Sequence, residues 1–159
     1  MKGDTMKRGS TLFLKLVIVI LGLIVLAICA FALPALIGSD KTGYYRPILI
    51  GLYVPALPFF FALYQALKLL GYIDKNLAFS EMSVKAFAVI KYCALLIAVI
   101  FTAGMPYIYI AADRDDAPGV IVIGLVIIFA SLVIATFAAV LQKLVQNAVV
   151  MKSENDLTV

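Results

Sequence analysis

Histidine is absent from this 159-residue chain, and cysteine occurs only twice, at Cys29 and Cys93. Without histidine, the chain has no Ser–His or Cys–His pair for nucleophilic catalysis. Two isolated cysteines also provide no ligand set for zinc and no redox motif. The sequence therefore predicts no catalytic residues, no metal site and no cofactor, and we expect a protein that is not an enzyme.

Charged residues are scarce as well, at 14% of the chain, whereas 65% of the residues are hydrophobic. Four stretches exceed the roughly 18 apolar residues that mark a membrane-spanning helix. We place these spans at residues 12–37, 47–70, 81–110 and 119–141, which leaves no room for a separate soluble domain. The sequence predicts an all-α protein, an integral membrane four-helix bundle that forms a single domain over residues 1–159 in a lipid bilayer.

The distribution of lysine and arginine predicts the orientation, because basic residues concentrate in cytoplasmic loops. With the N-terminus inside, only Lys41, Arg46 and Arg114 of the 13 basic residues lie outside. We therefore expect both termini to be cytoplasmic in a multi-pass protein of the bacterial inner membrane. The net positive charge is then a topology signal and does not indicate direct nucleic-acid binding. Either Met1 or Met6 fits as the natural start.

The fourth helix is expected to outrun the membrane. Apolar residues continue beyond residue 141 at helical spacing, with polar residues on the other face, which predicts an amphipathic cytoplasmic extension over residues 142–152. At the start of the third helix, Ser80 is a predicted N-cap. These two helix ends either pair as a short stalk or lie on the membrane surface.

Residues 153–159, the polar tail, are expected to leave the helix and to end in an extended segment. Such a C-terminal peptide can add to the sheet edge of a partner protein, or it can be an idle, frayed end. The hypothesis of partner binding concerns Glu154, Asn155, Asp156, Leu157, Thr158 and Val159.

Small residues repeat every four positions in the last two spans, and helices in lipid pack through small residues. The predicted packing positions are Ala94, Ala98, Thr102, Ser131, Ala135 and Ala139. The sequence does not decide whether such faces also join copies of the chain into a homo-oligomer.

Prolines and several tyrosines gather toward the predicted outer half of the spans, where prolines should bend the helices. This pattern fits an interfacial aromatic belt, or an outward-facing vestibule for a small amphipathic ligand. The vestibule hypothesis concerns Tyr53, Pro55, Pro58, Tyr107 and Tyr109.

Two segments carry a resemblance to a known family: "NLAFSEMSVKAFAVIKYCA" at residues 76–94 and "LQKLVQNAVVMKSENDLTV" at residues 141–159. Over essentially its whole length, the chain resembles the bacterial membrane proteins of domain of unknown function 2975, the YoaS-like proteins. Members of this family are often encoded beside a helix-turn-helix regulator of the Cro/CI type. The resemblance therefore implies a regulatory or sensory membrane partner of such a transcription regulator, and it implies no catalytic residues.

A second function class stays open beside the regulatory one. The kinked, tyrosine-rich half of the chain also fits a small-molecule-handling membrane protein, such as an exporter, a permeation accessory or a resistance factor.

Overall fold

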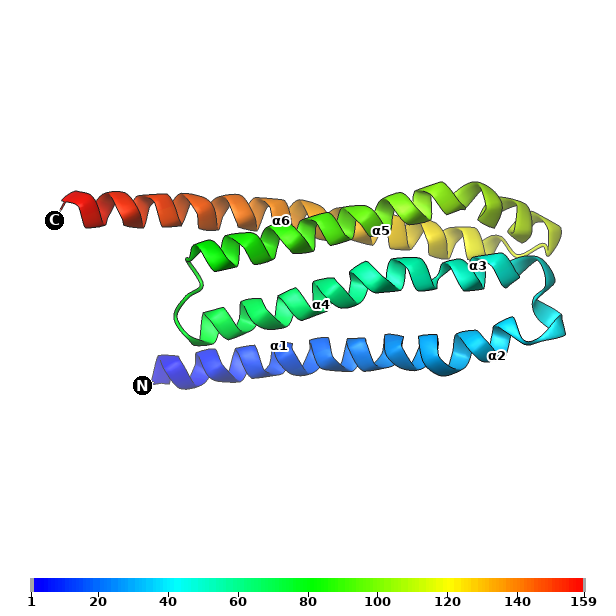
Figure 1. Cartoon of the computed structure of the whole chain (residues 1–159), viewed down its shortest axis with the longest axis horizontal. Coiled ribbons are helices and arrows are strands. Elements are labelled where there is room, and N and C mark those ends of the chain that lie inside the picture. Colours follow the sequence, from blue (N-terminus) through cyan, green and yellow to red (C-terminus); the bar gives the residue numbers. More distant parts are fainter. Residues whose placement is uncertain (1, 159) are drawn as a thin grey trace.

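The computed structural model describes residues 2–158, and their side chains from residue 9 onward except those of Thr42, Tyr44, Asp156 and Thr158. This described part of the chain is helical and contains no strand (Figure 1). Four helical segments are long and apolar enough to cross a membrane, at Gly9–Ile37, Arg46–Asp74, Glu81–Arg114 and Pro118–Asn155. The predicted all-α architecture with four spans is confirmed.

The first two spans are each built from several helices. The first consists of α1 (Lys2–Ala27), a π-helical turn η1 (Ile28–Ala32) and α2 (Leu33–Ile37). A 3₁₀-helical segment η2 (Asp40–Tyr45) leads to α3 (Arg46–Gly51) and α4 (Tyr53–Asp74), which together form the second span. The third and fourth spans are the single helices α5 (Glu81–Arg114) and α6 (Pro118–Thr158).

Prolines explain where the first two spans are interrupted. A proline has no N–H to donate and its ring clashes with the carbonyl four residues earlier. The break between α3 and α4 lies at Gly51–Leu52, and Gly51 is four residues before Pro55. In the first span, the π-helical turn ends at Ala32, two residues before Pro34.

Successive spans run antiparallel, so both termini lie at one end of the bundle together with the connection at residues 75–80 (Figure 1). We call this end the terminus side. The opposite end, which carries the connections at residues 38–45 and 115–117, is the loop side.

Polar residues terminate α4 and α5 and start α5. Asn76 and Asp116 adopt positive φ angles of 61° and 50°, the left-handed conformation that closes a helix C-terminus. In each case the next residue donates its N–H to the carbonyl five positions earlier, as Leu77 does to Tyr72 at 2.7 Å. Ser80 caps α5, as predicted, and its Oγ accepts from the N–H of Ser83 at 3.4 Å.

The spans pack in chain order. α6 packs most extensively on α5, α5 on α4, and α4 on α1. Among the described residues, α1 and α6 have no extensive contact with each other. The bundle is therefore an open row of helices, in which α1 and α6 do not pack extensively on each other.

Small residues line the α5–α6 contact, as the sequence predicts in part. Ala94, Ala98, Ser131 and Ala135 are buried, whereas Ala139 is half-buried and Ala138 takes the buried position. Eight residues turn a helix by about 800°, about 80° past two full turns, so a strict four-residue repeat rotates away from its partner. The buried positions on α6 accordingly follow a step of four and then a step of three, at Ser131, Ala135 and Ala138.

Thr102 lies outside this packing stripe for the same reason. Its side chain is exposed, and its hydroxyl donates to the carbonyl of Ala98 on its own helix at 2.7 Å. The hydroxyl is thereby satisfied without a contact to another helix.

The polar tail differs from its prediction. α6 continues as a helix through Thr158, instead of ending near Lys152 and becoming extended. No glycine or proline follows Gly124, so no residue in the second half of α6 forces the helix to stop. Val159 lies outside the described residues.

Candidate functional site

The terminus side carries a helix end that projects from the bundle. α6 extends past the start of α5 and past the N-terminal end of α1 (Figure 1). Val145 is still buried, with 8% of its surface exposed, so α6 remains packed on the bundle to this point. This burial favours the stalk-like pairing of α5 and α6 over helix ends that lie on the membrane surface.

Beyond Val145, the projecting end of α6 exposes both apolar and polar side chains. Met151 and Leu157 are exposed, and Leu157 has 84% of its surface accessible. Among the residues predicted to bind a partner, Glu154 and Asn155 are also exposed. The side chains of Asp156 and Thr158 lie outside the described part. The structure thus presents Leu157 on a helix. In this conformation the segment does not add as a β-strand to the sheet of a partner protein.

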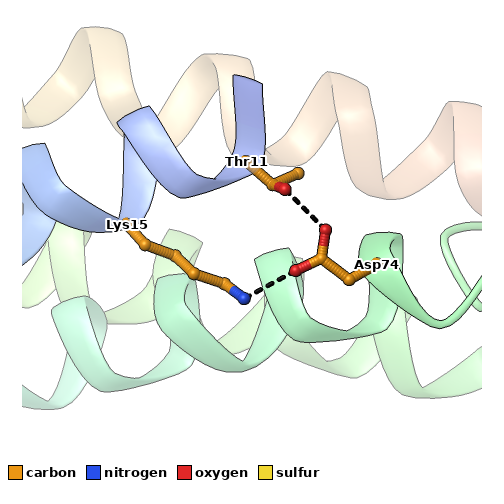
Figure 2. A network of polar contacts seen from close by, with 3 residues as sticks. All are labelled: Thr11, Lys15 and Asp74. Atoms are coloured by element: carbon orange, nitrogen blue, oxygen red, sulfur yellow. Dashed lines mark hydrogen bonds and ion pairs between the residues drawn. The ribbon is translucent and has the colours of Figure 1, made fainter. Parts of the chain in front are cut away.

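A polar network joins α1 and α4 at the terminus side (Figure 2). The hydroxyl of Thr11 donates to Oδ1 of Asp74 at 2.5 Å, and the ammonium of Lys15 donates to Oδ2 at 2.6 Å. Thr11 is buried, whereas the side chains of Lys15 and Asp74 retain 34% and 25% exposure. Both carboxylate oxygens of Asp74 therefore have a donor from the facing helix.

Sequence reasoning missed this network because it ended the second span at residue 70 and left Asp74 outside it. A signal was present. Thr11 and Lys15 are four residues apart and so share one helix face. Because consecutive spans run antiparallel, the start of the first span lies beside the end of the second. Asp74 is therefore brought next to the face that carries Thr11 and Lys15.

Two further lysines in the terminus-side half of the bundle, Lys91 and Lys68, contact neutral partners. Lys91 donates to Oε1 of Gln142 across the α5–α6 contact at 3.0 Å, and its ammonium lies 4.7 Å from the ring centroid of Tyr92. Lys68 lies 4.9 Å from the ring centroid of Tyr64. Aromatic faces stabilise cations electrostatically. In the part of the chain that the structure describes, no group of His, Cys, Asp or Glu could hold a metal ion.

On the loop-side half, Tyr53 links the second span to the first. Its hydroxyl donates to the backbone carbonyl of Cys29 at 2.8 Å. In the π-helical turn, the N–H of Leu33 bonds to the carbonyl of Ile28, five residues earlier. The next pair in this register would be Pro34 and Cys29, but Pro34 has no N–H. Tyr53 therefore supplies the donor that Pro34 withholds.

We expect Tyr53→Phe to lower the free energy of unfolding in detergent by about 1 kcal/mol, because a hydrogen bond to a carbonyl inside the bundle is lost. Thermal unfolding followed by circular dichroism measures the change. Tyr109→Phe is the matched control, since Tyr109 is exposed. Equal stability of the two variants would mean that the Cys29 carbonyl finds another donor.

The other predicted vestibule residues are only partly brought together. A pocket of about 340 Å³ lies between α3, α4 and α5, and Pro55 and Tyr107 line it. Pro58 is half-buried within α4 and Tyr109 is exposed, and neither lines this pocket. Tyr53 faces η1 in the first span instead.

The two loop-side connections meet at Tyr45 and Asp115. The hydroxyl oxygen of Tyr45 is buried and has no hydrogen-bond partner among the described residues. This burial raises the pKa of Tyr45, and the nearby carboxylate of Asp115 raises it further. Tyr45 is therefore neutral at physiological pH and acts as a contact between the connections.

Comparison with known proteins extends over all four spans. A family model described as "Protein of unknown function (DUF2975)" matches residues 37–159. The uncharacterized membrane protein YoaS of Bacillus subtilis (strain 168) is 56% identical over 160 residues, covering 97% of this chain and 100% of the relative. No solved structure matches the chain.

Proposed function

The chain belongs to the DUF2975 family of proteins of unknown function, and from this premise we propose that it is a regulatory membrane partner of a cytoplasmic helix-turn-helix transcription regulator. It is a multi-pass membrane protein, and its environment is the lipid bilayer. The observation that carries the proposal is the projecting end of α6, residues 146–158, which leaves the bundle with apolar side chains exposed.

The exposed residues of this projecting end suit a helix that docks into a groove. Val150 and Leu157 are seven residues apart and lie on one side of the helix, and Met151 lies beside Val150. Partner helices are commonly recognised through apolar anchors at such spacing. Glu154 adds a negative charge that matches the basic surface of a DNA-binding protein. The bound regulator would then be held away from DNA at the membrane.

The proposal requires the terminus side to face the cytoplasm. We expect a cysteine at position 41 to be labelled by an impermeant maleimide from outside intact cells, and a cysteine at position 153 only after the membrane is opened. Lys41 and Ser153 are both exposed, so accessibility itself does not limit either reaction. Cys29 and Cys93 are first replaced by alanine as the background. External labelling at position 153 would contradict the orientation.

Binding of the purified regulator that is encoded beside this chain tests the function directly. Removal of residues 153–159 should weaken binding at least tenfold, and Leu157→Ser should do so on its own. Asn147→Ala is the control, because Asn147 is exposed on the same helix but is not an apolar anchor. Binding should also weaken as salt rises. Equal affinity of the full and shortened chains would refute the docking role of the projecting end.

The loop-side pocket favours a second candidate function, the handling of a small molecule. Its lining combines Pro55, Gly104 and Tyr107 at the level where α3 and α4 meet α5. An aromatic hydroxyl in an otherwise apolar pocket suits an amphipathic ligand. Ligand-dependent flux in liposomes that is lost in Gly104→Leu, with unchanged binding of the regulator, would favour this function over the first.

A further inference from the structure

All four spans line one elongated cavity between the helices. This cavity is a different feature from the projecting end of α6. Its volume is about 550 Å³. Val25 and Leu33 from the first span, Ala66 from α4, Ile97 from α5 and Ile134 from α6 are among the residues that line it. The thiol of Cys29 and the hydroxyl of Ser131 are the two polar side-chain groups in the lining. An apolar cavity of this kind does not hold water favourably.

The shape of the cavity is long and narrow. Leu52 and Ala66 both line it on α4, and they are 14 residues apart, which is about 21 Å along a helix. The cavity holds about 550 Å³ over this length. A helix with side chains is about 10–12 Å across, so about 21 Å of it would occupy at least roughly 1,600 Å³. A helix from a second copy therefore does not fit.

The cavity has a lateral route to the bilayer. α1 and α6 both contribute to its wall, yet they make no extensive contact with each other among the described residues. Ile28 and Ile134 line the cavity from the first and fourth spans and are themselves exposed, so the cavity is open on this side, toward the hydrocarbon interior of the membrane. The long axis of the cavity follows α4, a spanning helix, and therefore lies in the direction of the surrounding lipid chains.

From these features we propose that the cavity binds one hydrocarbon chain of a membrane phospholipid. The apolar lining matches the chain along its length, the volume is too small for a helix, and the gap between α1 and α6 lets the chain enter sideways from the bilayer. Neither a water-soluble ligand nor a partner helix satisfies all three conditions.

The chain contains no tryptophan, so one introduced tryptophan reports on its own surroundings. Phe59 lines the cavity, and Phe59→Trp is placed in vesicles of phosphatidylcholine whose acyl chains carry bromine, a short-range quencher of tryptophan fluorescence. We expect its fluorescence to fall at least twofold relative to unbrominated vesicles. Phe137→Trp, at an exposed position on α6, gives the quenching expected for ordinary contact with lipid.

Filling the cavity separates a bound chain from lipid outside the bundle. Ala130 lines the cavity, and Ala130→Phe should reduce the quenching of Phe59→Trp at least twofold while leaving that of Phe137→Trp unchanged. Ala27→Phe, at an exposed position outside the lining, should leave both reporters unchanged. If Ala130→Phe is not recovered as a folded protein, Ala130→Leu takes its place. An unquenched Phe59→Trp, or quenching that survives filling, would overturn the proposal.

Discussion

Ala135→Leu is expected to lower the free energy of unfolding by about 1–3 kcal/mol, the usual cost of inserting bulk into a packed interior. The expectation follows from the register of α5 against α6. Lys91 bonds to Gln142, and moving seven residues, about two turns, along each antiparallel helix leads to Ala98 and Ala135. Both alanines are only 4% exposed, so a larger side chain at Ala135 has no room without moving a helix.

Thermal unfolding in detergent measures the effect, and two comparisons make it specific. Ala103→Leu, at an exposed position on α5, should change stability by less than about 0.5 kcal/mol. Ala98→Gly combined with Ala135→Leu should recover part of the loss, because it removes the methyl group opposite the new side chain. If Ala135→Leu is as stable as the Ala103 variant, the two alanines do not face each other.

Asp74→Ala is expected to lower the free energy of unfolding by about 1–2 kcal/mol. Hydrogen bonds to charged groups are worth about 1.5–3 kcal/mol, and partial exposure of Lys15 and Asp74 reduces this value through solvent screening. The loss comes from two sources: the buried hydroxyl of Thr11 loses its acceptor, and the ammonium of Lys15 loses its counter-ion. Unfolding in detergent again provides the measurement.

A double-mutant cycle assigns the loss to the ion pair. Lys15→Ala should cost less in the Asp74→Ala background than in the unaltered protein, by about 0.5–1 kcal/mol. Glu154→Ala, an exposed carboxylate on the projecting end of α6, should leave stability unchanged and serves as the control. Additive effects of the Lys15 and Asp74 substitutions would mean that the two side chains act independently.

Much of the fold could be predicted because each span is a long apolar segment bounded by polar residues. The N-cap at Ser80 and the buried alanines at positions 94, 98 and 135 also follow from local rules. Those rules describe one helix at a time. They do not say at which depth two helices meet, so the partners of Asp74 and of Tyr53 emerged only from the three-dimensional arrangement.

At the C-terminal segment, local rules gave a wrong prediction. The polar residues from Ser153 onward predict a loop, because serine, asparagine and aspartate favour turns. Each of these preferences is worth less than about 1 kcal/mol per residue. The polar residues extend a helix that is already formed, so the helix continues through them without a new nucleation step. The cavity was also beyond prediction, since it depends on the absence of close packing between the first and last spans.

The open row of helices has a consequence for biogenesis. Every span packs on the span that precedes it in the chain, and none depends on closing a ring with the first. Each newly inserted span therefore meets its docking surface already present in the membrane. The order in which the ribosome delivers the helices is the order in which the protein can assemble, and the pair with the most extensive contact, α5 and α6, is completed last.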